Sequence, residues 1–458
     1  MSREFLLRTL SVAALAAMTA PAAYAASTLN GGGATSPQGD YAGPNNSKGA
    51  PTSELSTYNA ATTGAVYGTY WGSGSTGQTA FLNNDLTCDI NKVTGNNGGK
   101  CSGTPGGADT VHYNFSDSAL NTTQTAQWST STWGQSAAGN LIQLPALGTG
   151  EAIVVNDTNI TANGKLQLSD SDLCEIFSGG YTDFSQITDS STAPAAGAFQ
   201  FVYRVDSAGT TFIITEHLSH ACTAGNSNGI TFTPTSTFAT LFPGGNVNAK
   251  IPNAVPQTGN SGIANYLAGL TTSGTIPQAI GYVAPDWTSV PTAPDTFLSN
   301  GKTSPLLVAA VFNGTTAYIP NTANLTLALK HISAVASGSP SNPPSTAAQG
   351  ANPLNWIPII QAVSTGYPIV GYGTVDIAQC YSDPTVAAAV IAFLTDHYKV
   401  AAYKGIQKKN GLVAVSATKG ANFIAVIADH ILANKGNAKT AWNIDIQDPK
   451  VCKGLVGR

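Results

Sequence analysis

Residues 201–212, FVYRVDSAGTTF, join a strand-like run to a helix-like run through a turn of small residues. Apolar side chains lead into the turn at Arg204, and an apolar pattern with helical spacing follows Gly209. This layout places backbone N–H groups and hydroxyls at a helix N-terminus, where the helix dipole favours an anion. Arg204 adds a permanent positive charge, and Asp206 can hold its guanidinium in place. The segment therefore predicts a site for a small dehydrated oxyanion, with phosphate as the leading candidate.

Three further segments combine glycine, hydroxyl and amide groups in the same way. They are residues 29–37 (LNGGGATSP), 70–77 (YWGSGSTG) and 114–119 (NFSDSA). Turns of this composition are common in exported proteins, so each one alone is weak evidence for a binding site. It is their occurrence together with the segment around Arg204 that indicates one shared anion site.

Strand-like and helix-like patterns alternate along the whole chain, which favours an α/β fold. Residues 152–156 and 279–283 are short apolar runs typical of buried strands, and they bracket a segment of domain size. We expect these strands to cross between two lobes, with residues 26–150 and 288–458 in lobe 1 and residues 151–287 in lobe 2. Because α/β sheets bind ligands at strand ends, the cleft between the lobes is the expected binding site.

The first 25 residues have the features of a signal peptide. Arg3 and Arg8 accompany an apolar run, and Ala23-Tyr24-Ala25 is a small-x-small cleavage sequence. No cysteine near that sequence offers a lipid anchor, and no later run approaches about 18 consecutive apolar residues, so no membrane span is expected. The sequence predicts an exported soluble protein, either periplasmic or secreted.

Charge and cysteine content narrow the classes of partner. The leader contains two of the 20 basic and one of the 24 acidic residues, so the mature chain is mildly acidic, which disfavours nucleic acid. Six cysteines form an even set suited to disulfides, and no CxxC motif indicates a metal. We expect no metal and no cofactor. Proximity suggests three of the pairings that six cysteines allow: Cys88–Cys101, Cys174–Cys222 and Cys380–Cys452.

These segments resemble the phosphate-binding proteins of ABC importers, in particular the DING branch named after its mature N-terminus. Residues 28–35, TLNGGGAT, resemble that N-terminal signature, although Thr28 and Leu29 stand where the name has Asp and Ile. The similarity extends to the segments AFLNN (80–84), LCEIFS (173–178), YPIV (367–370), QCY (379–381) and VCKGLVGR (451–458). The pairings Cys174–Cys222 and Cys380–Cys452 are similar to disulfides of that branch, whereas Cys88–Cys101 is extra.

The resemblance implies a two-lobed periplasmic-binding-protein (PBP) fold, type II-like, with phosphate in the cleft and an ABC permease complex as partner. Position 208 departs from the family pattern, since a serine is usual there and alanine keeps only its N–H group. The implied ligand set is Thr35, Ser36, Ser75, Ala208, Gly209 and Thr210 as donors, Arg204 as the paired cation oriented by Asp206, and Asp117 as the lone acceptor.

Asp117 is the residue from which selectivity is expected. A carboxylate that faces a fully ionised anion in a dry cleft leaves two negative charges unpaired, which is costly. Hydrogen phosphate has a proton to donate to that carboxylate, but sulfate at neutral pH has none. The alternative is that Asp117 only caps its own loop.

Two other functions are compatible with the sequence. The first is a phosphomonoesterase, because Asp117-Ser118-Ala119 resembles the nucleophile segment of zinc alkaline phosphatases, and His217 and His220 are a closely spaced pair. That chemistry requires clustered metal ligands, and the sequence has no GxSxG, HExxH or Walker motif. The second is a surface adhesin on the same scaffold, which the high Gly, Ser and Thr content suits. The sequence favours a phosphate-binding protein over both.

Overall fold

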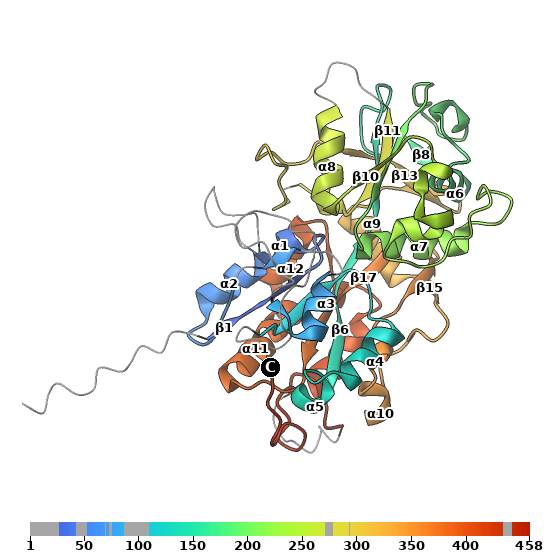
Figure 1. The fold of residues 1–458 in the computed structure, drawn as a ribbon. Coiled ribbons are helices and arrows are strands. Elements are labelled where there is room, and N and C mark those ends of the chain that lie inside the picture. The colour runs from blue at the N-terminus through green and yellow to red at the C-terminus, as the bar shows by residue number, and fades with distance from the viewer. Residues whose placement is uncertain are drawn as a thin grey trace, which may run out of the picture.

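The computed structural model describes residues 27–42, 53–68, 70–72, 76–86, 110–270, 278–292, 294–433 and 442–458. These residues form a mixed α/β structure with two lobes, each built around its own sheet (Figure 1). The predicted signal peptide, the predicted ligand Ser75 and the predicted pair Cys88–Cys101 lie outside the described residues.

The first lobe contains a six-stranded sheet that combines strands from both ends of the chain. Its long central strands are antiparallel, and their pairing runs from Leu141 opposite Ala378 to Gly150 opposite Val370. The sheet order is β18 (Val413–Ala414), β6 (Leu141–Gly150), β17 (Val370–Ala378), β5 (Tyr113–Ser116), β2 (Gly31–Gly33) and β4 (Trp71–Gly72).

The second lobe contains a five-stranded sheet. Its order is β10 (Ala254–Gln257), β9 (Gln200–Arg204), β11 (Ala279–Val283), β7 (Ala152–Asn156) and β12 (Leu307–Val308). Every residue of β7 and β11 is buried, which explains why both strands are continuous apolar runs in the sequence. The two strands predicted at 152–156 and 279–283 are thus confirmed, and they pair antiparallel with each other.

The chain crosses from the first sheet to the second where β6 meets β7, and only Glu151 separates these two strands. After β11 it enters a short 3-10 helix, η6 (Pro285–Trp287), and then returns to the same sheet with β12. The position of the lobe boundary stays a proposal. Because β12 pairs with β7, and β13 (Ala310–Asn313) with β8 (Gln167–Leu168), we propose that lobe 2 extends past residue 287 to β14 (Thr316–Tyr318).

Helices cover both sheets (Figure 1). Those of the second lobe are α6 (Asp170–Ser178), α7 (Gly209–Ala221) and α8 (Gly259–Leu270). The others are α1 (Gln38–Ala42), α2 (Glu54–Ala61), α3 (Thr76–Asn83), α4 (Thr122–Thr130), α5 (Gln135–Ala138), α9 (Thr322–Lys330), α10 (Ala347–Gly350), α11 (Pro384–Lys399), α12 (Ala401–Lys409) and α13 (Ala421–His430). Two small strand pairs complete the fold: β1 (Thr28–Leu29) with β3 (Val66–Tyr67), and β15 (Ile332–Val335) with β16 (Ile360–Val363). Within the described ranges, the helices are all too short or too polar to span a bilayer.

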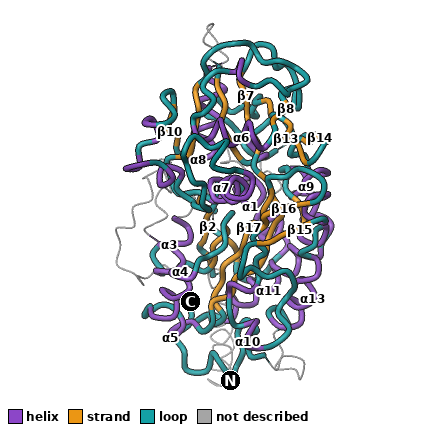
Figure 2. Tube along the Cα trace, turned by 90° about the vertical axis from the view of Figure 1, so that its right-hand side faces the viewer, coloured by secondary structure: helices purple, strands orange, loops and turns teal. Residues whose placement is uncertain are grey.

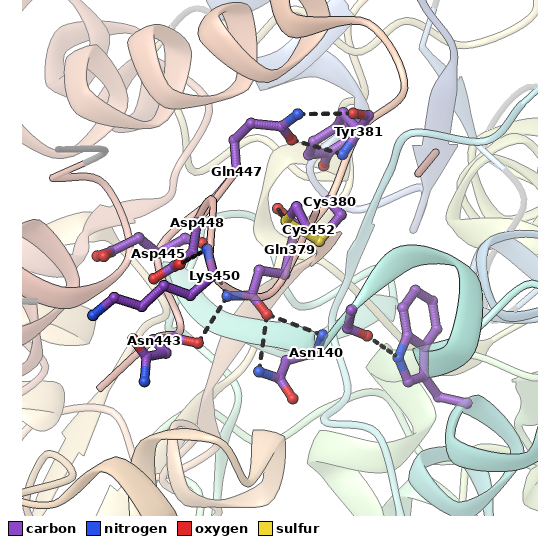
Figure 3. Close-up of a disulfide and its surroundings, with 12 residues drawn as sticks. Asn140, Gln379, Cys380, Tyr381, Asn443, Asp445, Gln447, Asp448, Lys450 and Cys452 are labelled. Atoms are coloured by element: carbon purple, nitrogen blue, oxygen red, sulfur yellow. Dashed lines mark hydrogen bonds between the residues drawn. A yellow bond between two sulfur atoms is a disulfide. The ribbon is translucent and has the colours of Figure 1, made fainter. Parts of the chain in front are cut away.

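Two of the predicted disulfides are present, and each one ties distant segments together. Cys174–Cys222 joins α6 to the end of α7 across 48 residues, and Cys380–Cys452 joins the end of β17 to the C-terminal segment across 72. Closing loops of this length stabilises the fold by about 4 kcal/mol each in the chain-entropy model. Beside Cys380 the side chain of Gln379 bonds Asn140, Asn443 and Asp445, so the second disulfide lies in a hydrogen-bonded junction (Figure 3).

We predict that Gly33→Ala strongly destabilises the protein. Gly33 has a φ of +142°, and a Cβ atom there would lie 1.8 Å from the carbonyl oxygen of Phe115 on β5. The substitution therefore separates β2 from β5 or strains both strands, and the expected loss in the free energy of unfolding is on the order of 3 kcal/mol. Urea unfolding measures this loss. Gly64→Ala, at an open position whose nearest contact is 3.6 Å away, is the control, and an equal effect of both substitutions would contradict the prediction.

Candidate functional site

Arg204 ends β9 and is buried, with 1% of its side chain exposed. Its Nε and Nη2 donate to the two carboxylate oxygens of Asp206 at 2.7 and 2.5 Å. Nη1 donates to the hydroxyl of Thr210 at 2.9 Å and to the amide oxygen of Asn260 at 3.2 Å. Of the five N–H groups of the guanidinium, one on Nη2 has no acceptor among the described residues. Burial alone would lower the pKa of Arg204, but its hydrogen bonds and charge interaction with Asp206 raise it overall.

The N-terminus of α7 lies beside this guanidinium, because Thr210 accepts from it. The helix lies at the level where the two lobes meet (Figure 2). Its N-cap residue, Ala208, makes no side-chain cap. The amides of Gly209 and Thr210 therefore have no acceptor within the described chain, and the dipole of a 13-residue helix adds to their positive field. The structure corrects one prediction here. The N–H of Ala208 donates to the carbonyl of Ser236 at 2.8 Å, so it is not available to an anion in this conformation.

Asp117 follows β5 in the first lobe and contacts the start of α7 in the second. A Cβ atom on Gly209 would lie 2.1 Å from the Cβ of Asp117, so only a glycine allows this close approach. Asp117 is buried, and no hydrogen bond from the described residues reaches its carboxyl group. Burial raises the pKa of Asp117 to about 7, against the opposing effect of Arg204. The carboxyl group is thus an acceptor without a partner, placed beside a helix N-terminus.

The turn after β2 completes the region from the side of the first lobe. The hydroxyl of Thr35 accepts from Nδ2 of Asn260 at 3.3 Å, while Oδ1 of the same Asn260 accepts from Arg204. Ser36 is buried, and its hydroxyl has no partner within the described chain. The structure therefore brings Thr35, Asp117, Arg204, Asp206, Gly209 and Thr210 together between the lobes, with Ser36 next in sequence.

Three residues of this region are missing from the sequence prediction. Asn260 links Arg204 to Thr35, and its position in the first turn of α8, after Gly259, is a weak signal that sequence reasoning could have used. Glu151, between β6 and β7, and Asp286, in η6, are fully buried carboxyl groups. Burial first, and then the charge of Asp117, raise the pKa of each well above the ordinary value. No motif marks either acid in the sequence.

The residues of the phosphomonoesterase alternative are placed as follows. The hydroxyl of Ser118 lies 3.4 Å from that of Ser116. His217 lies 2.8 Å from the carboxylate of Asp170, and His220 lies 3.3 Å from that of Glu216. In the part of the chain that the structure describes, no group of three or more His, Cys, Asp or Glu residues is arranged to hold a metal ion.

Comparisons with known proteins agree with this architecture. The chain is 31% identical to alkaline phosphatase L of Pseudomonas aeruginosa, over 99% of this chain and 98% of the relative. The solved structure of a DING protein has a TM-score of 0.69 and 28% identity, over 94% of this chain and 99% of that one. A high-affinity periplasmic phosphate-binding protein solved with bound phosphate has a TM-score of 0.67 and 27% identity, with the same coverage.

The family model described as a PBP superfamily domain matches residues 52–354. This segment includes the five strands of the second sheet and every described residue of the region around Arg204 except Thr35 and Ser36. Because the match spans more than half of the sequence, and because the similar solved structures are DING and phosphate-binding proteins, the chain belongs to the PBP superfamily.

Proposed function

We propose that this protein binds inorganic phosphate, as hydrogen phosphate, in the cleft between its two lobes. The observation that carries the proposal is the partnerless carboxyl group of Asp117 beside the uncapped N-terminus of α7 and the guanidinium of Arg204. A tetrahedral ion there meets donors on one side and a single acceptor on the other. That combination suits an oxyanion that still carries a proton.

The donors come from both lobes. The amides of Gly209 and Thr210 and one N–H of Arg204 face the ion from the second lobe, and Thr35 and Ser36 face it from the first. Ser75 is proposed as a further donor on the strength of its sequence segment. Since the amide of Ala208 bonds Ser236, the proposed set does not include it. Hydrogen bonds to a charged group are each worth about 1.5–3 kcal/mol, so this set is sufficient to bind phosphate tightly.

The comparisons support phosphate as the ligand, since one similar solved structure contains it. We further propose that residues 1–25 are a cleaved signal peptide and that the mature protein is periplasmic or secreted. Both observed disulfides are typical of an oxidising compartment outside the cytosol. An ABC permease complex is the proposed partner for uptake, in keeping with membership of the PBP superfamily.

A phosphomonoesterase is the second candidate, favoured by the 31% identity to alkaline phosphatase L. In that function Ser118, next to the proposed acceptor, is the candidate nucleophile. Its side chain is buried, and its hydroxyl lies 3.4 Å from the hydroxyl of Ser116, with no histidine bonded to it among the described residues. A serine hydroxyl needs a neighbouring base or metal to become a nucleophile, so the described geometry favours binding over hydrolysis.

We predict that Asp117→Asn erodes the selectivity for phosphate over sulfate. The substitution replaces the carboxylate, which repels sulfate and accepts a hydrogen bond from hydrogen phosphate, with a neutral amide. A hydrogen bond to a charged group is worth about 1.5–3 kcal/mol, so the ratio of the sulfate dissociation constant to the phosphate dissociation constant should fall roughly tenfold to a hundredfold. Isothermal titration calorimetry with both anions measures the ratio. Asp429→Asn, on the exposed face of α13, is the matched control. An unchanged ratio in Asp117→Asn refutes the assignment of Asp117, and a wild type without any response to phosphate favours the adhesin alternative.

The same carboxyl group predicts a pH dependence of stability in the unliganded protein. The folded-state pKa of Asp117 is about 7, against 3.8 for an ordinary Asp. Between these two pH values the folded protein therefore keeps a proton on Asp117 that the unfolded chain has already lost. The free energy of unfolding therefore falls as pH rises from about 4 to about 7. Asp117→Asn should lack this loss. Its free energy of unfolding, relative to that of wild type, should therefore rise by on the order of 3 kcal/mol between pH 4 and pH 8. Urea unfolding of phosphate-free protein at both pH values tests it, and an equal difference at the two values would contradict it.

We expect no hydrolysis of p-nitrophenyl phosphate that depends on Ser118. The measurement is turnover by wild type, Ser118→Ala and the control Ser129→Ala, an exposed serine on α4. Turnover of p-nitrophenyl phosphate that remains after purification, is measured with added zinc and is lost in Ser118→Ala but not in Ser129→Ala would establish the phosphomonoesterase instead.

A further inference from the structure

The side-chain amide of Asn260 has a fixed orientation. Asn260 lies in the first turn of α8 and is fully buried. Its Oδ1 accepts from Nη1 of Arg204 at 3.2 Å and from the backbone N–H of Ala284 at 3.3 Å. Both partners can only donate, so the amide oxygen must face them and the Nδ2 group must face away. That Nδ2 group donates to the hydroxyl oxygen of Thr35 at 3.3 Å, so Asn260 presents a donor to Thr35 and never an acceptor.

This donor decides what the hydroxyl of Thr35 can do. A hydroxyl group has one proton to donate and accepts with its oxygen. Because Nδ2 of Asn260 offers no lone pair, the hydroxyl proton cannot be directed at it. Within the described chain no hydrogen bond takes this proton, and Thr35 lies on the first-lobe side of the proposed anion site. Thr35 therefore meets the anion as a donor.

Thr210 has the same arrangement in the second lobe. Nη1 of Arg204 donates to its hydroxyl oxygen at 2.9 Å, and a guanidinium has no lone pair to accept with. The two N–H groups of Nη1 thus direct two hydroxyls, that of Thr210 at first hand and that of Thr35 through Asn260. Every bond on both routes runs from the cation toward the hydroxyl, and hydrogen bonds aligned in this way polarise one another. The field of Arg204 is thereby extended to hydroxyls from both lobes.

A purely structural role does not account for the amide at position 260. The N–H groups of Arg204 and Ala284 need only an acceptor oxygen, and an aspartate would supply it together with a charge that compensates the guanidinium. What an asparagine adds is the donor that meets Thr35. The choice of an amide therefore points to the direction of the Thr35 hydroxyl.

We propose that Asn260 is a positioning residue of the phosphate site, which holds the hydroxyl of Thr35 as a donor and so leaves Asp117 as the single acceptor. The inference rests on the proposed function and assigns a further residue to its selectivity. A hydroxyl that is free to turn accepts from a ligand as readily as it donates to one. Holding it as a donor restricts the site to an oxyanion that carries one proton, because only one acceptor is left to receive a proton.

The test compares the cost of losing the Thr35 hydroxyl in two backgrounds. Isothermal titration calorimetry with inorganic phosphate gives the dissociation constants of the mature wild type, Thr35→Val, Asn260→Asp and the double variant. In the wild-type background Thr35→Val should weaken binding about tenfold to a hundredfold, because a donor to a charged group is lost. Asn260→Asp keeps the acceptor for Arg204 but also accepts the proton of Thr35, so Thr35→Val should there cost less than about threefold. The negative charge that Asn260→Asp adds is present with and without the hydroxyl, so it cancels in this comparison.

Asn246→Asp is the matched control, since it makes the same chemical change at an exposed position between α7 and β10. Thr35→Val should keep its full cost in that background. A merely structural role of Asn260 would weaken binding in Asn260→Asp without changing the cost of Thr35→Val.

Each outcome decides the proposal. An equal cost of Thr35→Val in wild type and in Asn260→Asp overturns it and leaves the proposed function intact, and so does a Thr35→Val protein that binds phosphate as tightly as wild type. No binding of phosphate by wild type is instead a failure of the proposed function, and the inference falls with it. If Asn260→Asp does not fold, Asn260→Ala replaces it. The Thr35 hydroxyl is then free to turn, so the cost of Thr35→Val should fall at least about threefold, and an unchanged cost overturns the proposal.

Discussion

The buried pair of Arg204 and Asp206 is the interaction on which the site depends. A guanidinium with 1% exposure must be fully compensated, and Asp206 does this with two hydrogen bonds. The same Asp206 oxygen that accepts from Nε also accepts from the first amide of α8 at 3.0 Å. One carboxylate thus fixes the cation and the start of a helix, and from that helix Asn260 reaches Thr35 across the cleft.

Two small residues shape the start of α7 beside the site. Alanine at position 208 leaves α7 without a side-chain cap, so the first amides of the helix remain available. Glycine at position 209 lets the backbone of α7 approach Asp117 without a clash. An ordinary N-cap serine and any larger residue after it would stabilise the helix in isolation. The sequence instead leaves amides free at the point where an acceptor from the other lobe arrives.

Local chemistry explains what could be predicted from the sequence and what could not. The buried strands at 152–156 and 279–283 are almost entirely apolar because both their faces are covered, so composition alone marked them. The cluster around Arg204 is contiguous in sequence, and its internal bonds follow from that spacing. The bond between Ala208 and Ser236 and the link through Asn260 depend on loops and helices that meet only in the fold. Glu151 and Asp286 are single acids within apolar segments, and only the fold shows that both are buried.

The balance of charge in the cleft favours an anion that brings its own proton. Three buried carboxyl groups (Asp117, Glu151 and Asp286) lie in this region, and the guanidinium of Arg204, which also bonds Asp206, acts on Asp117 and Glu151. A site that binds a fully ionised anion needs an excess of cations, because burying like charges together is costly. Here the donors are mostly neutral amides and hydroxyls, which stabilise an oxyanion without adding net charge. Selectivity then depends on where protons can reside, because every acid that stays neutral makes room for one negative charge on the ligand.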